Sequence, residues 1–204
     1  MSGEQRRLQF MAQPKEASIL PAEYLALSCI QGENGRWGYT IPSKLSNASL
    51  CIECDLEIVE WNTNSNNCLF GSTMVGYGAL GVVTTTTEPI CVMHQGKGLS
   101  SVTFNTLSKG RHVYSMYYTH LDIDGEVVAN YNYGYTIVTL NIFGSEWNVC
   151  PLMRVHHIVV RVGDDIKHDL YPCVRLSDNK IGFYDTISNS FSVRPTTGNF
   201  TGIT

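Results

Sequence analysis

Three carboxylates alternate along one short stretch of the chain, at Glu53, Asp55 and Glu57. Residues two apart on a β-strand point to the same face, so a strand here would place all three on one surface. A retaining glycosidase needs two carboxyl groups about 5 Å apart, one as nucleophile and one as general acid. A solvated strand face gives the same spacing, and we favour it. We therefore assign no catalytic residue. The alternative is a glycoside hydrolase whose catalytic residues would come from Glu53, Asp55 and Glu57.

A second candidate is a run of asparagine and tyrosine that begins at residue 130. Tyrosine rings stack on sugar faces or on partner side chains, and asparagine amides both donate and accept hydrogen bonds. The predicted ligand-binding residues are Asn130, Tyr131, Asn132, Tyr133 and Tyr135. Tyrosine is equally enriched in the cores of subunit interfaces, and an interface is the interpretation that we prefer.

Patterns that resemble metal sites are incomplete. Cys51 and Cys54 are three residues apart, and His156 and His157 are adjacent, so on regular strands each pair points to opposite faces. Segment 122–125 begins like a calcium loop, but the later ligands are missing. A hairpin turn explains this segment better, and a calcium ion bound at such a turn stays an open alternative. We predict no metal site and no cofactor.

The elements that would position these residues are short strands joined by turns. From Leu50 to Val59 apolar residues alternate with mostly polar ones, which is typical of a strand with one wet face. Asp124-Gly125 predicts a two-residue hairpin turn, and 163–165 predicts another. No stretch shows a helical stripe, so the sequence predicts an all-β sandwich. We expect an N-terminal arm over residues 1–21 and a single domain over 22–204.

Composition excludes several classes of function. The net charge of -4 supplies no basic surface for nucleic acid. The apolar run from Ile137 to Phe143 is far shorter than the roughly 20 residues that cross a bilayer, and no export signal is visible, so we expect a soluble protein. Seven cysteines, an odd number in a chain of this length, argue against a disulfide framework. We expect most to be small buried hydrophobes of a protein made in a reducing compartment.

The C-terminal third carries an ordered series of short motifs. The segments are Val155–Asp165, Asp169–Cys173, Ile181–Asp185 and Thr197–Phe200. This series resembles the ending of the concanavalin-A-like (laminin-G-like) domains in surface and virion proteins of gut bacteria and their phages. The likeness covers roughly residues 20–204, except that 32–39 departs from the usual first strand. It implies a jelly-roll β-sandwich of two antiparallel sheets. From the residue types themselves we expect Pro172 and Cys173 to close a strand at an edge and Gly182 to admit close backbone approach.

The resemblance also implies a role. It suggests a non-enzymatic structural or adhesive protein of a phage virion, such as a head fibre, a capsid decoration or a tail-associated protein, docked by its arm. Its partners would be other virion or surface subunits, with a homo-oligomer expected and glycans as a further ligand class. Made in the host cytoplasm, it would end in the virion. The alternative is a carbohydrate-binding module on a bacterial surface. The carboxylate strand also resembles the Glu-x-Asp-x-Glu strand of laminarinase-type β-glucanases, which share this fold.

Overall fold

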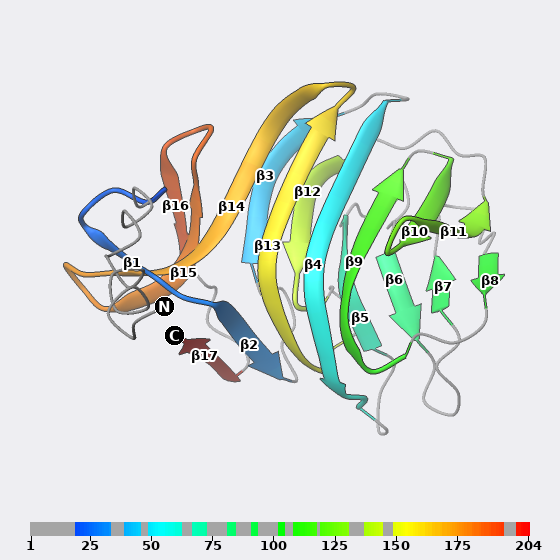
Figure 1. The fold of residues 1–204 in the computed structure, drawn as a ribbon, viewed down its shortest axis with the longest axis horizontal. Coiled ribbons are helices and arrows are strands. Elements are labelled where there is room, and N and C mark those ends of the chain that lie inside the picture. Colours follow the sequence, from blue (N-terminus) through cyan, green and yellow to red (C-terminus); the bar gives the residue numbers. More distant parts are fainter. Residues whose placement is uncertain are drawn as a thin grey trace, which may run out of the picture.

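The computed structural model confirms an all-β chain built as a sandwich of two antiparallel sheets. In Figure 1 the smaller sheet lies behind the long, curved strands of the larger one. The structure describes residues 19–33, 39–45, 49–62, 67–72, 81–84, 91–93, 102–104, 108–117, 119–130, 137–144, 149–193 and 199–204. Most of the predicted arm therefore lies outside the described residues.

The larger sheet has 11 strands. Its main path runs in the order β11 (Glu126–Asn130), β10 (His120–Ile123), β9 (Gly110–Tyr117), β4 (Leu50–Glu60), β13 (Leu152–Val162), β14 (Asp165–Arg175), β15 (Lys180–Asp185) and β16 (Ser190–Val193). Off this path, β1 (Tyr24–Ala26) pairs with β14, and β2 (Cys29–Glu33) pairs with β13 and with β17 (Asn199–Ile203). The smaller sheet has the order β3 (Tyr39–Leu45), β12 (Ile137–Ile142), β5 (Asn67–Ser72), β6 (Gly81–Thr84), β7 (Cys91–Met93) and β8 (Val102–Phe104).

Strand β4 confirms the alternation read from the sequence. Its even-numbered residues from Leu50 to Ile58 are buried in the core between the sheets, whereas the three carboxylates face outward. Leu69 and Phe70 of β5 contribute to the same core from the smaller sheet. The ring of Phe70 meets that of Tyr114 on β9 edge to face, with centroids 6.3 Å apart, so aromatic packing joins the two sheets.

A β-bulge overturns the prediction that His156 and His157 face opposite ways. Val155 pairs with Leu56 and His157 pairs with Asp55, so His156 is an extra residue on β13. Val155 and Ile158 are both buried in the core, and the two histidines between them are partly exposed. The bulge shifts the phase of the strand by one residue, and both imidazoles therefore lie on the outer face.

The second correction concerns Pro172, which lies inside the sheet and not at an edge. Strand β14 runs between β13 and β15, but its pairing with β13 ends at Leu170, and its pairing with β1 begins at Cys173. The carbonyl of Pro172 accepts a hydrogen bond from Leu27 N–H on that same side. Pro172 thus occupies the gap between two partner strands, where no ladder donor is required.

Other expectations hold where the structure describes them. Asp124 and Gly125 have φ angles of 54° and 83°, as a type I′ hairpin turn requires. A Cβ added to Gly182 would collide with the Ser192 carbonyl oxygen, which confirms close backbone approach at that position. The cysteines with described side chains are buried thiols: Cys29, Cys51, Cys54, Cys68, Cys150 and Cys173. Among the described residues, no helix is long and apolar enough to span a bilayer.

Segments far apart in the chain meet at one end of the larger sheet. Strand β17 pairs with β2 along five residues of each strand, from Asn199↔Glu33 to Ile203↔Cys29. Leu20, which precedes β1, is buried against Cys173 and Tyr184. The packed domain therefore extends to Leu20, and the chain enters it beside β14 and β15.

Candidate functional site

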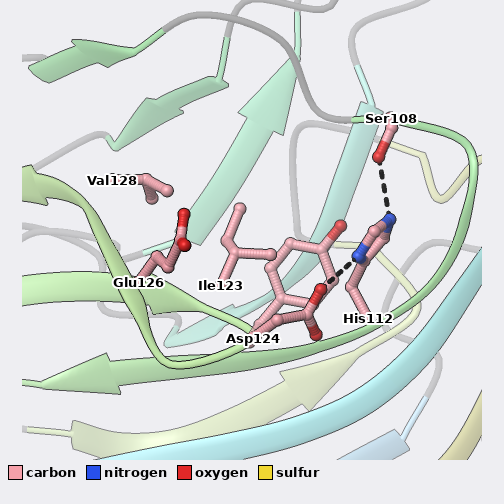
Figure 2. A pocket seen from close by; sticks show the side chains of 7 residues that line it. Ser108, His112, Ile123, Asp124, Glu126 and Val128 are labelled. Atoms are coloured by element: carbon pink, nitrogen blue, oxygen red, sulfur yellow. Dashed lines mark hydrogen bonds and ion pairs between the residues drawn. The ribbon is translucent and has the colours of Figure 1, made fainter.

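A pocket of about 370 Å³ lies at the end of the larger sheet formed by β9, β10 and β11. Its walls combine a hydroxyl, an imidazole, two carboxylates and apolar side chains. They come from Ser108, His112, Tyr114, Ile123, Asp124, Glu126 and Val128. In Figure 2 Ser108, His112 and Asp124 follow one another on one side, while Glu126 and Val128 lie beyond Ile123. This mixture of polar and apolar groups makes the pocket our candidate functional site.

The hairpin turn fixes Asp124 at the mouth of the pocket. Its backbone N–H donates to the carbonyl of Val113, and its Oδ1 accepts a hydrogen bond of 2.8 Å from the Val113 N–H. Two hydrogen bonds to one residue of β9 hold both the backbone and the carboxylate of Asp124. Positive φ at residues 124 and 125 makes this arrangement possible, because it turns the chain back sharply after β10.

His112 connects the carboxylate to a serine. Its Nδ1 lies 2.6 Å from Oδ2 of Asp124, and its Nε2 lies 2.8 Å from Oγ of Ser108. A neutral imidazole with its proton on Nδ1 satisfies both contacts, donating to Asp124 and accepting from the serine hydroxyl. The hydrogen bond from His112, together with that from Val113 N–H, lowers the pKa of Asp124 below its ordinary value. The carboxylate is thereby favoured as an anion that orients the ring.

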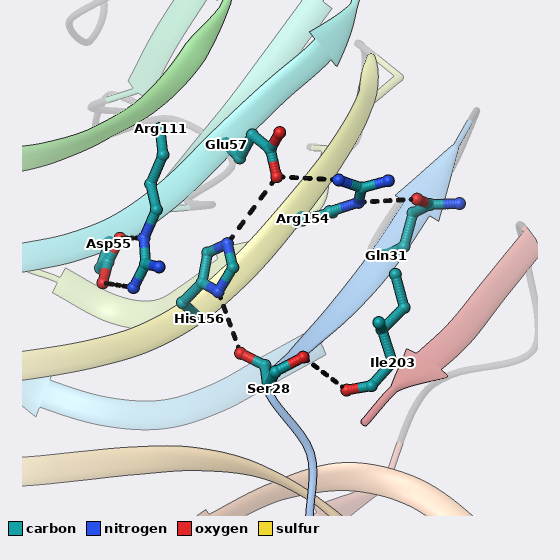
Figure 3. A network of polar contacts seen from close by, with 8 residues as sticks. All are labelled: Ser28, Gln31, Asp55, Glu57, Arg111, Arg154, His156 and Ile203. Carbon is teal, nitrogen blue, oxygen red and sulfur yellow. Dashed lines mark hydrogen bonds and ion pairs between the residues drawn. The ribbon is translucent and has the colours of Figure 1, made fainter.

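The alternating carboxylates lie elsewhere, on the outer face of the larger sheet, and each faces an arginine. Asp55 accepts hydrogen bonds of 2.8 and 2.7 Å from Arg111, as Figure 3 shows. Glu57 accepts one of 3.0 Å from Arg154. Glu53 lies 3.9 Å from Arg161. The structure thus brings these carboxylates into a row of cross-strand ion pairs.

The ion pair of Glu57 with Arg154 is part of a network that joins four strands (Figure 3). Arg154 also donates to the side chain of Gln31 on β2. His156, placed by the bulge, has Nδ1 2.9 Å from the Ser28 carbonyl and Nε2 4.0 Å from Glu57. The Ser28 hydroxyl in turn donates to the carbonyl of Ile203 on β17. The network spans β2, β4, β13 and β17, which indicates a structural role.

A separate cluster of histidines and aspartates lies over β13, β14 and β15. Nε2 of His157 lies 2.7 Å from Asp169, and Nδ1 of His168 lies 2.8 Å from the buried Asp185. Asp185 accepts further hydrogen bonds from Ser188 Oγ and from two backbone N–H groups. Burial raises the pKa of Asp185, but these hydrogen bonds outweigh it and leave the pKa below its ordinary value.

Of the five predicted ligand-binding residues, the structure describes only Asn130. Asn130 ends β11 and is exposed, opposite His120, whereas Tyr131, Asn132, Tyr133 and Tyr135 lie outside the described residues. The sequence reasoning missed Ser108, His112 and Glu126. The antiparallel pairing of 110–117 with 120–123 sets Asp124 beside Val113 and next to His112, and that register comes from the structure.

Within the described ranges, no group of three or more His, Cys, Asp or Glu side chains is arranged to hold a metal ion. The pocket and the outer-face network are thus two distinct arrangements, one open to a ligand and one closed by ion pairs. No protein-family model and no curated protein matches this sequence.

Proposed function

We propose that this chain is a structural and binding module, and that it assembles with other subunits through the β1 and β16 end of the larger sheet. The supporting observation is a set of exposed aliphatic side chains at that end. They are Ile19, Leu25, Leu176, Ile187 and Val193. Exposed apolar side chains that gather in one region are typical of interaction surfaces, whereas scattered ones are not.

The backbone keeps two of these side chains on neighbouring segments. Leu25 is 51% exposed on β1, and Leu176 is also 51% exposed just after β14. The Leu176 N–H donates to the carbonyl of Glu23, which ties the turn after β14 to the start of β1. Burying such side chains against another subunit gains about 25 cal/mol for each Å² of apolar surface removed from water.

The same end receives the chain from the predicted arm. Leu20 is buried against Cys173 and Tyr184, and the rings of Tyr24 and Tyr184 pack at a tilt of 47° with centroids 4.7 Å apart. An arm that docks on a neighbour would leave the domain beside the exposed aliphatic residues. This coincidence supports docking by the arm and by the β1 end together.

The resemblance to concanavalin-A-like domains of phage and gut-bacterial surface proteins supplies the context of the proposal. We assign the chain to a phage virion, as a head fibre, a capsid decoration or a tail-associated protein, with bacterial surface attachment as the alternative. Mass spectrometry of purified phage particles that encode this sequence should detect it. Its consistent absence from such particles would contradict the virion assignment.

Assembly is tested by measuring the mass of the full chain in solution with light scattering after gel filtration. We expect the unaltered chain to form a defined oligomer, and the double variant Leu25→Ser/Leu176→Ser to dissociate. Val127→Ser is the matched control, because Val127 is 55% exposed but lies on β11 at the other end of the sheet. A monomeric unaltered chain, or equal dissociation of the control, would contradict the proposal.

Carbohydrate binding is the second candidate, and the pocket favours it. Ile123 and Val128 offer apolar surface to a sugar ring, while Glu126 and Asp124 accept hydrogen bonds from sugar hydroxyls. A glycan array should then show binding that Glu126→Gln weakens. Glu53→Gln on the outer face is the control and should bind normally. If the tyrosine-rich segment also contacts the glycan, Tyr133→Ala should weaken binding as well.

A further inference from the structure

We propose that Ser108 is a nucleophile that hydrolyses esters of short, uncharged acyl groups, with His112 as its general base and Asp124 as the carboxylate that orients the imidazole. This activity goes beyond the assembly role proposed above, and it differs from the expectation of a non-enzymatic protein. The pocket that carries it lies at the opposite end of the larger sheet from Leu25 and Leu176, the residues proposed for assembly.

This inference depends on the order in which the serine, the imidazole and the carboxylate contact one another. A serine becomes nucleophilic when the free nitrogen of an imidazole takes its proton, and the imidazole needs a carboxylate on its other nitrogen to hold it in the correct tautomer. Here Ser108 Oγ meets Nε2 at 2.8 Å, and Asp124 Oδ2 meets Nδ1 at 2.6 Å. Both distances lie within hydrogen-bond reach, so an unbroken chain of hydrogen bonds joins the serine hydroxyl, the imidazole and the carboxylate.

The positions of the three groups are set by the sheet itself. His112 lies on β9, and Asp124 is held against the next residue of that strand by its two hydrogen bonds to Val113. The carboxylate therefore cannot turn away from the ring without breaking the bond from the Val113 N–H. The imidazole side chain is 23% exposed, so the sheet shields most of the ring, whereas the Asp124 side chain is 52% exposed and keeps its orientation through its hydrogen bonds.

Other hydroxyl, histidine and aspartate groups on this molecule lack that order. In one cluster Ser188 and His168 both contact Asp185, so the carboxylate stands between the serine and the imidazole. In another, the Thr186 hydroxyl contacts Asp169 and not His157. Neither hydroxyl contacts an imidazole in these clusters, so neither has a base to accept its proton. These clusters are thus structural and serve as internal comparisons.

The group around His120 is closer to the required order but is incomplete. Thr119 Oγ1 lies 2.9 Å from Nδ1 of His120, and Nε2 lies 3.4 Å from Asp122. Oδ1 of Asp122 makes no hydrogen bond, so its contact with Nε2 does not hold the ring as Asp124 holds His112. The ring instead stacks on Tyr117, with centroids 4.4 Å apart. Ser108 is therefore the better candidate.

The reaction runs in two steps that balance. First, Ser108 Oγ forms a bond to the ester carbonyl carbon while its proton passes to His112 Nε2, the carbon–oxygen bond to the alcohol breaks, and the alcohol leaves with that proton. Second, a water molecule gives a proton to Nε2 and attacks the acyl-serine, and the carboxylic acid leaves as Ser108 regains its proton. Asp124 stays ionised throughout.

The lining of the pocket limits the acyl group. A volume of about 370 Å³ is at the small end of ligand pockets, so the group must be short. Ile123 and Val128 provide apolar contacts for an alkyl chain, and Glu126 repels an acyl group that carries a negative charge. Acetyl and butyryl esters fit these demands, and succinyl esters do not.

The test combines a covalent probe with turnover of p-nitrophenyl acetate and butyrate by the full chain. A fluorophosphonate should add one label per chain, and peptide mapping should place it on Ser108. Ser108→Ala should lose the label and the turnover. Asp124→Asn should keep the turn, because asparagine tolerates positive φ and still accepts from Val113 N–H, but should lower kcat/KM by about 10³-fold or more.

Ser188→Ala is the matched control, since it removes a serine from the cluster in which Asp185 lies between the serine and the imidazole. This variant should keep both label and turnover. Thermal unfolding of each variant shows whether the fold is intact. Absence of a label on the unaltered chain, a label on another residue, or unchanged turnover in folded Ser108→Ala would overturn the proposal. Unchanged turnover would assign the hydrolysis to a histidine alone.

Discussion

The guanidinium of Arg111 on β9 binds both carboxylate oxygens of Asp55 on β4, with hydrogen bonds of 2.8 and 2.7 Å. The Asp55 side chain is 22% exposed and that of Arg111 is 57% exposed, so the carboxylate half of this pair is less screened by water than a fully exposed one. We predict that Asp55→Asn lowers the free energy of unfolding by about 1 kcal/mol, measured by urea unfolding.

Glu60→Gln is the control for this ion pair. Glu60 binds Lys109 at the end of the same strand, but both side chains are at least half exposed. We expect no measurable change in stability for this variant. If both variants lost the same free energy of unfolding, burial and bidentate geometry would not explain the contribution of Asp55.

Among the glycines that the structure describes, Gly182 on β15 is the one whose nearest obstacle to a side chain is a backbone atom at clashing distance. A Cβ there would overlap the Ser192 carbonyl oxygen and lie 2.6 Å from the Phe191 ring. Because the obstacle is backbone, β16 would have to move away from β15. Gly182→Ala should therefore cost about 2–3 kcal/mol of stability, measured by chemical unfolding. Lys180→Ala, an exposed change on the same strand, should be close to neutral.

Asp185 should make stability depend on acid pH. Its pKa lies below the ordinary value of 3.8 in the folded chain, so the unfolded chain binds a proton more readily at acid pH. The contribution of Asp185 is therefore complete above pH 3.8 and is lost as the pH falls through the lowered pKa.

Asp185→Asn tests this dependence by unfolding measurements between about pH 5 and pH 2. The variant should be less stable at pH 5, and its stability should fall less steeply with acid than that of the unaltered chain. Asp164→Asn, in an exposed turn, should leave the slope unchanged. A parallel fall in Asp185→Asn would show that other groups cause the acid sensitivity.

The buried cysteines should resist thiol reagents. Burial raises the pKa of Cys51 and of Cys173 to about 11, which leaves almost no reactive thiolate at neutral pH. Cys54 lies in the core between the sheets, and burial raises its pKa as well. Iodoacetamide labelling read by mass spectrometry should modify these residues slowly in the folded chain and rapidly in urea. Rapid labelling of Cys54 without denaturant would contradict the packing described for β4.

How much the sequence predicts depends on whether the pattern is local. The alternation from Leu50 to Val59 identifies β4 because one face meets the core along the whole strand. The Asp124-Gly125 turn is also local, since its φ angles follow from the two residue types. These elements were predicted correctly for that reason.

The features that the sequence did not reveal depend on pairing between distant segments. The extra residue at His156 exists only relative to β4, and nothing near it on the chain marks a bulge. The position of Pro172 is explained by two different partner strands that end on either side of it. The contact of His112 with Asp124 joins residues 12 apart and needs the register of the hairpin. Side-chain types alone do not give that register.

The pairing of β17 with β2 has a consequence for how the chain acquires its structure. Ser28 and Ile203 are 175 residues apart, yet they share a side-chain and a backbone hydrogen bond. During synthesis β2 is made well before both of its neighbours, β13 and β17. Its edges stay open until then, so the sheet closes late and folding is slow. The nascent chain should accordingly depend on chaperones that cover exposed strand edges.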